Sequence, residues 1–200
     1  LLAQVVWWSN NFGEESLNLM YDENNVIING QRSTEKGPGN RLTLKLDYVL
    51  PIGESNKFET GYQGNISDSD ESNEMNLYSI ANQQFENNEL FSKDVNYRTN
   101  IQAFYAMFGG KAGEFGYQFG LRTEYTDRFI DLLGETTNFE LKRWDYYPTA
   151  HFSYNLPSEQ EVMASYTRRL QRLRGWYLEP FYTWRDAYDI LIGKPDWIPE

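Results

Sequence analysis

The sequence predicts an all-β protein, an antiparallel transmembrane β-barrel with short periplasmic turns and long outer loops. Two observations predict it: polarity that alternates with a period of two, and connections that are sorted by length. Short turns at 51–56, 109–113 and 157–160 join the clearest strand pairs, and the links between these hairpins are much longer. In a transmembrane barrel, one rim carries short turns and the other carries longer loops.

Composition agrees with this fold class and excludes several others. Aromatic residues make up 16% of the chain, which favours strands and membrane interfaces. The absence of Cys excludes disulfides and thiolate metal sites, and a net charge of -11 argues against nucleic acid as a partner. No apolar stretch is long enough for a membrane-spanning helix. The mean hydropathy of -0.69 does not exclude a barrel, because lipid-facing and lumen-facing side chains alternate.

The first clear hairpin covers 41–50 and 57–66. Even-numbered positions of its first strand are apolar, namely Leu42, Leu44, Leu46, Tyr48 and Leu50. The odd positions Thr43, Lys45 and Asp47 are polar, so the two faces differ. Residues 1–40 are expected to add two or three strands, within 4–8, 16–21 and 25–29, with a turn or loop at 36–39.

The longest alternation covers 93–108 and 114–127. In the first strand the odd positions are expected to form the apolar face, namely Val95, Tyr97, Thr99, Ile101, Ala103, Tyr105 and Met107. In the second strand the apolar face contains Phe115, Tyr117, Phe119, Leu121, Thr123 and Tyr125. The opposite face is small or charged, as expected for a water-filled or plugged lumen.

The third hairpin covers 144–156 and 161–170. The six expected strands are therefore 41–50, 57–66, 93–108, 114–127, 144–156 and 161–170. The segments 67–92, 128–143 and 171 onward are expected to be outer loops. Residues 1–200 form one barrel segment, and because strand 93–108 is longer than a bilayer requires, we expect an arc of a large barrel. The chain starts at Leu1, shows no signal peptide, and is expected to be a fragment.

Several short motifs carry a resemblance to a known family. They are Asp47 to Gly53, Gly120 to Thr126, Tyr147 to Leu156, Ala164 to Leu170, Leu178 to Phe181 and Gly193 to Glu200. In this order they resemble the barrel of TonB-dependent outer-membrane receptors of the Bacteroidetes type, over roughly residues 41–200. The chain departs from the family pattern at Leu173, Glu179, Lys194 and Trp197. These departures affect the inference of substrate more than the inference of fold.

The resemblance implies a transporter of the bacterial outer membrane and not an enzyme. Its implied partners are outer-membrane lipid, an unknown small substrate such as a siderophore, glycan or peptide, and the TonB system. Contact with TonB would pass through an N-terminal plug domain, and neither the plug nor the TonB-contact segment is in these 200 residues. The resemblance implies no cofactor.

The sharpest candidate site is a cluster of cations at the start of the last predicted loop. It contains Arg168, Arg169, Arg172 and Arg174, followed by Trp176. Arginine matches phosphate and carboxylate groups, so the cluster could contact an anionic substrate or lipopolysaccharide. The alternative is a strand end whose arginines extend to the membrane rim or pair with lumen carboxylates.

Three other motifs give weaker evidence for a functional site. Residues 68–74 begin like a calcium loop, but Asn73 and Ser79 replace the required Gly and Glu, so a solvated outer loop is favoured. The glycines at 109–113 form a turn with no helix behind them to bind phosphate. His151 is the single histidine, on a polar strand face, and a lumen position is favoured over a catalytic one. Two alternative hypotheses remain: a soluble or secreted all-β carbohydrate-binding module, and an outer-membrane barrel enzyme.

Overall fold

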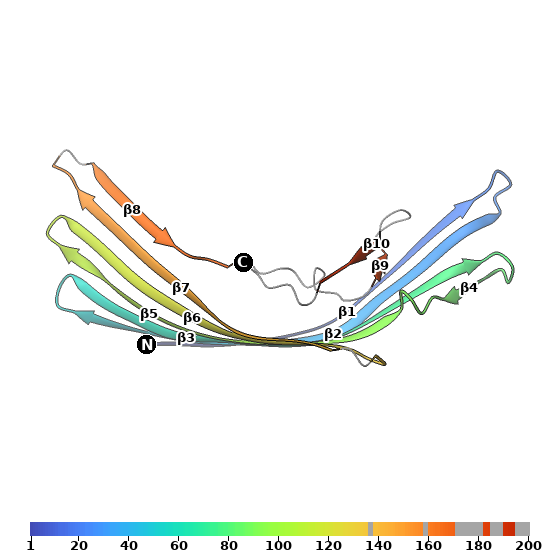
Figure 1. Ribbon diagram of the computed structural model, residues 1–200, viewed down its shortest axis with the longest axis horizontal. Coiled ribbons are helices and arrows are strands. Elements are labelled where there is room, and N and C mark those ends of the chain that lie inside the picture. Colours follow the sequence, from blue (N-terminus) through green and yellow to red (C-terminus); the bar gives the residue numbers. More distant parts are fainter. Residues whose placement is uncertain (136–137, 158–159, 171–181, 185–189, 195–200) are drawn as a thin grey trace.

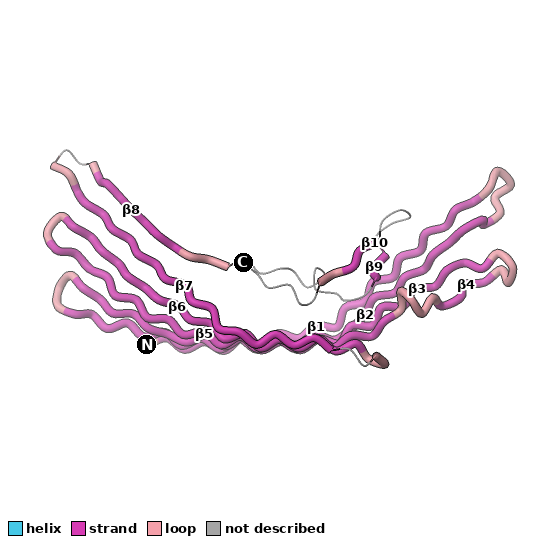
Figure 2. The backbone as a smooth tube through the Cα atoms, in the orientation of Figure 1, coloured by secondary structure: helices cyan, strands magenta, loops and turns pink. Residues whose placement is uncertain are grey.

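The computed structural model describes residues 1–135, 138–157, 160–170, 182–184 and 190–194. Its strands are β1 (Leu2–Tyr21), β2 (Ile27–Ile52), β3 (Asn56–Ser79), β4 (Gln84–Asn87), β5 (Lys93–Ala112), β6 (Phe115–Leu132), β7 (Asn138–Asn155), β8 (Glu161–Thr167), β9 (Tyr182–Trp184) and β10 (Ile190–Ile192). Figures 1 and 2 show one long, curved and twisted sheet, and the described residues contain strands, turns and loops but no helix. None of them therefore forms a helix that could cross a membrane. The predicted all-β antiparallel fold is confirmed.

The main sheet has eight strands and two open edges. Its order is β1-β2-β3-β5-β6-β7-β8, with β4 paired to β3, and each pair is antiparallel. Strand order follows chain order, as in a meander built from consecutive hairpins. Since β1 and β8 end the order and do not pair with each other, the sheet is an arc and not a closed barrel. β9 and β10 pair separately.

The strands are longer than the sequence predicted. The expected strand 41–50 is the second half of the 26-residue β2, and 57–66 is the first part of the 24-residue β3. Much of the predicted loops 67–92 and 128–143 is therefore strand, because polar side chains also pair across the ladder. Asp68 of β3, for example, forms an ion pair with Arg98 of β5 at 3.2 Å. The prediction of a third outer loop from 171 onward lies mostly outside the described residues.

The expected turn at 36–39 is also part of a strand. β2 pairs with β1 through Lys36, Gly37, Pro38 and Gly39 without a shift of register. A Cβ at Gly37 would lie 1.7 Å from the carbonyl oxygen of Asp70 in β3. Glycine is thus required here because the neighbouring backbone passes too closely for a side chain.

The turn between β1 and β2 is held by the side chain of Asp22 together with two backbone hydrogen bonds, from Asp22 N to Val26 O at 2.9 Å and from Asn25 N to Asp22 O at 3.1 Å. Asp22 accepts backbone hydrogen bonds from Asn24 and Val26, both at 2.8 Å, and Asn25 has a φ of 60°. The hydrogen bond from Val26 is the largest of the effects that lower the pKa of Asp22. A charged acceptor strengthens these bonds, and asparagine tolerates the left-handed conformation.

We expect the turn to loosen when Asp22 is protonated or replaced. A lowered pKa in the folded state means that ionised Asp22 stabilises the turn above the ordinary Asp pKa, and that this contribution is lost as pH falls through the folded value. Asp22→Ala should remove the contribution at all pH values. Amide hydrogen exchange at Asn24 and Val26, measured in the full-length protein from pH 6 to pH 3, checks this. Equal protection in Asp22→Ala and wild type would contradict it.

The cross-strand register sorts the side chains onto two faces. Directly paired residues of antiparallel strands lie on the same face. The row Tyr48, Thr60, Ala106, Leu121 and Pro148 belongs to one face, which we call the apolar face. The row one position along each strand contains Asp47, Gly61, Tyr105, Arg122 and Tyr147 and belongs to the other face, which we call the polar face.

The register corrects the predicted face of β5. Phe104 and Phe108, at even positions, pair with Thr123 and Phe119 and lie on the apolar face. The odd positions 95 to 107, predicted to be apolar-facing, lie on the polar face. The sequence misleads because both parities are apolar from 103 to 108. For β6 the predicted apolar face is the observed one.

The buried side chains belong to the polar face. Val95, Ile130 and Leu132 are at most 3% exposed and form a small cluster, with Tyr97 and Phe139 packed against it. The other buried members of this face are Met75, Ala103, Glu124, Thr126 and Asp145. Side chains crowd on the inner face of a curved sheet and spread on its outer face, so this distribution identifies the polar face as the inner, concave one.

Candidate functional site: the two faces of the sheet

The apolar face presents a continuous exposed band of hydrophobic side chains. On β6 it runs from Phe115 to Tyr125, a length of about 33 Å along the strand. A strand tilted by about 40° would span about 25 Å with this length, the height of the apolar band of outer-membrane barrels. Neighbouring strands continue the band with large exposed side chains, among them Trp7, Leu46, Phe104, Trp144, Tyr146 and Tyr166.

Aromatic rings gather at both ends of this band. Near the short turns, Phe115 stacks on Phe152 with ring centroids 5.9 Å apart, and Phe119, farther toward the middle of the band, meets the same ring edge-on at 5.4 Å. At the other end, Tyr125 and Trp144 lie 5.2 Å apart. Two aromatic girdles around an apolar band are typical of a barrel wall between the interfaces of a bilayer.

The polar face carries charges in compensated pairs. Each pair joins a base and an acid two positions apart on one strand: Lys45 with Asp47, Lys57 with Glu59, Arg122 with Glu124, and Arg143 with Asp145. Residues two apart on a strand share a face, so the charges neutralise each other without crossing the sheet. The sequence analysis did not identify these charged pairs, although the spacing of two residues between opposite charges can be read from the sequence.

One hydrogen bond on the polar face spans three strands. The hydroxyl of Tyr105 on β5 donates to Asp47 Oδ1 on β2 at 2.7 Å, passing over Gly61 on β3. Lys45 Nζ lies 2.9 Å from the other oxygen of the same carboxylate. A Cβ at Gly61 would lie 2.5 Å from Tyr105 Cε1 and 2.6 Å from the backbone oxygen of Leu46, so glycine is required both for the ring and for the neighbouring strand.

We expect Gly61→Val to break this bridge. The new side chain would displace the Tyr105 ring and separate its hydroxyl from Asp47, at a cost of about 1–3 kcal/mol from overpacking. Urea unfolding of the full-length protein in liposomes measures the change. Gly53→Val is the control for loss of a glycine, because no atom lies within 4 Å of a Cβ there, although its φ of 64° adds backbone strain. If Gly61→Val/Tyr105→Ala loses less stability than Gly61→Val alone, the clash lies partly at the Tyr105 ring. An equal loss of stability in the two variants would contradict a clash with the ring.

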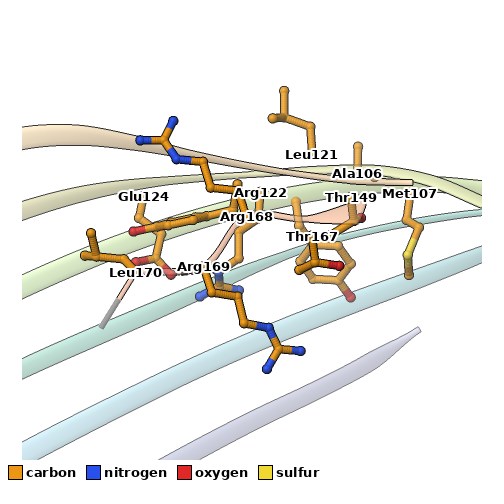
Figure 3. Close-up of a pocket in the computed structure, with 13 residues that line it drawn as sticks. Ala106, Met107, Leu121, Arg122, Glu124, Thr149, Thr167, Arg168, Arg169 and Leu170 are labelled. Carbon is orange, nitrogen blue, oxygen red and sulfur yellow. Dashed lines mark hydrogen bonds and ion pairs between the residues drawn. The ribbon is translucent and has the colours of Figure 1, made fainter. Parts of the chain in front are cut away.

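A cavity of about 410 Å³ opens beside this bridge. Tyr105, Met107, Gly120, Arg122 and Glu124 line one side, and Tyr147, Thr149, Thr167, Arg168, Arg169 and Leu170 line the other. Figure 3 shows Arg169 on the side of the strands that Met107 occupies, and Arg168 extending to the opposite side, where Leu121 lies. Strand alternation explains the separation, since consecutive residues point to opposite faces.

The predicted arginine cluster is therefore divided. Arg168 continues the ladder through a backbone hydrogen bond to Pro148 at 3.2 Å, and its side chain belongs with the apolar face. Arg169 belongs with the polar face. The other predicted members, Arg172, Arg174 and Trp176, lie outside the described residues.

The remaining candidates are ordinary strand residues. Asp68 and Asp70 lie in β3, not in a loop; Asp68 pairs with Arg98, and Asp70 accepts a hydrogen bond from Asn96. Within the described ranges, no group of three acidic or histidine side chains is arranged to bind a metal ion. His151 is exposed on the polar face, opposite Gln118 and Ser165 in the register. Neither direct neighbour in the register is a carboxylate.

These two faces define the class of protein: the wall of a transmembrane β-barrel, with one side for lipid and one for a polar lumen. Residues 4–200 match the model of the outer membrane protein beta-barrel family, and the chain belongs to that family. It is accordingly a protein of the outer membrane, as predicted. This location excludes the soluble binding module that the sequence left open.

A solved structure shares the fold. The crystal structure of ferric citrate transporter FecA in the unliganded form is similar with a TM-score of 0.50 and 15% identity, over 81% of this chain and 24% of that one. The chain thus spans about a quarter of the length of that transporter. No curated protein matches the sequence.

Proposed function

We propose that this arc is part of the barrel wall of a TonB-dependent-type outer-membrane transporter, of the kind found in Bacteroidetes, which takes up a nutrient with energy supplied through TonB. The proposal rests chiefly on one observation: the sheet is open at both edges while its apolar band has the height of a bilayer. Such an arc needs further strands to close a barrel, since an unpaired edge is not stable in lipid. Its role is transport and not catalysis.

The polar face supports this role. Paired charges and hydroxyl groups line it from Lys45 to Arg143, as a plugged or water-filled lumen requires. The sheet is also similar in fold to about a quarter of the chain of a ferric citrate transporter. In this proposal the plug and TonB-contact segment belong to parts of the protein beyond these residues.

Uptake measurements test the proposal. Cells with and without the full-length protein are grown in a medium containing ferric citrate, maltodextrins and a peptide digest, and the depletion of each compound is followed by mass spectrometry. We expect faster depletion of at least one class in cells with the protein, and loss of the difference when a protonophore or a deletion of TonB removes the energy source. Depletion that is independent of both would overturn energy-coupled uptake.

A further inference from the structure

The cavity beside Tyr105 has the size and the donors of a small-molecule site. Its volume of about 410 Å³ lies within the range of ligand pockets. Thr149 and Thr167 face each other across β7 and β8 and supply two hydroxyl groups to its wall. Met107 supplies an apolar surface. These groups suit a compact ligand that bears hydrogen-bond acceptors.

The charge in the cavity is not balanced within the described part of the chain. Arg122 Nε lies 2.7 Å from Glu124 Oε1, so this pair is neutral as a unit. Arg169 is exposed, and among the described residues it forms no ion pair. Arg168 also lines the cavity but extends to the opposite side of the strands (Figure 3), so Arg169 leaves one positive charge in excess on the polar face, in a chain whose net charge is -11.

We propose that this cavity binds a small anion through carboxylate or phosphate oxygens, with Arg169 as the charged contact and Thr149 and Thr167 as hydroxyl donors. A guanidinium fork matches both kinds of oxygen anion. The place of the cavity on a substrate path rests on the proposed transport function; the binding of an anion does not.

Gly120 keeps the cavity open. A Cβ at this position would lie 2.7 Å from Thr149 Oγ1 and 3.5 Å from Met107 Cγ. Any larger side chain would occupy the space between the hydroxyl and the thioether. Gly120→Val therefore fills the cavity without removing a charge, which separates the effect of shape from that of charge.

Two arginines provide a matched pair of variants. Arg169→Gln and Arg98→Gln each remove one positive charge, but Arg98, on β5, does not line the cavity. Isothermal titration of the full-length protein in detergent would use citrate, inorganic phosphate and the uncharged triethyl citrate as probes. Wild type should bind citrate or phosphate and not the ester. Arg169→Gln should weaken binding about tenfold, the effect of a lost charged hydrogen bond. Arg98→Gln should stay within about twofold, as expected for a screened charge away from the cavity.

A third substitution should act in the opposite direction. Glu124→Gln removes the negative charge beside Arg122, so the anion should bind about threefold more tightly. Gly120→Val should weaken binding of both anions. Heat-modifiable migration on gels shows that each variant is folded.

Three results would overturn the anion site: no binding of either anion by wild type, equal losses in the two arginine variants, or equal binding of triethyl citrate. Binding of citrate but not phosphate would identify a carboxylate ligand, and binding of phosphate but not citrate would identify a phosphate ligand. Either result supports the anion site. If binding fails while energy-coupled uptake is observed, the site is wrong and the transport function stands. If binding follows Arg169 while uptake fails, the site stands and the transport function is wrong.

Discussion

Phe119→Lys is expected to destabilise the protein in a bilayer by about 2–4 kcal/mol, the cost of a lysine at the lipid-facing midplane of a barrel. Phe119 lies in the middle of the apolar band of β6 and is 47% exposed. A charge there would lose its hydration in lipid. The urea dependence of tryptophan fluorescence, measured on the full-length protein in phosphatidylcholine liposomes, gives the change in free energy of unfolding.

The neighbouring residue gives the control. Gln118 precedes Phe119 on the same strand but lies on the polar face, opposite His151. Gln118→Lys adds the same charge to the lumen side and should change stability by less than about 1 kcal/mol, as for an exposed charge. If the two lysine variants were equally unstable, the assignment of the faces would be wrong.

Arg122→Ala, on the polar face, should destabilise the protein by a comparable amount. It removes a cation that pairs with Glu124, which is 6% exposed and lies directly opposite Asp145, itself 8% exposed. Removing one member of a buried ion pair costs about 3–5 kcal/mol, and we expect the lower end because the side chain of Arg122 is 33% exposed. The same liposome measurement at pH 7 reports the loss.

A double variant separates the charge from the contact area. Arg122→Ala/Glu124→Gln removes both members of the pair and should recover most of the stability, since no uncompensated charge remains. A double variant as unstable as Arg122→Ala would show that Arg122 acts by packing alone.

The side-chain alternation of β6 was sufficient to predict its faces. Apolar and polar residues exchange there at every position from Phe115 to Tyr125, so the period of two has one interpretation. In β5 it has two. Val95 and Tyr97 are apolar because they pack inside the outer half of the arc, whereas Phe104 and Phe108 are apolar because they face lipid. A single strand that serves two environments cannot be assigned by parity alone.

The lengths of the strands could not be predicted from hydrophobic pattern either. From Ser67 to Glu74, β3 is polar on both faces, which is the composition of a loop. Its strand conformation comes from ladder partners on β2 and β5, and these are distant in sequence. The candidate site has the same limit: the arginines were visible as a cluster, but the division of Arg168 from Arg169 depends on how β8 continues along β7.

β2 is much longer than a strand needs to be to cross a bilayer. Twenty-six residues extend about 80 Å along the strand, or about 60 Å in height at a barrel tilt of about 40°. The bilayer accounts for about 25 Å of this height. More than half of β2 therefore extends beyond the lipid. In the proposed transport function, a solute meets the ordered protein of β2 well before it reaches the level of the lipid.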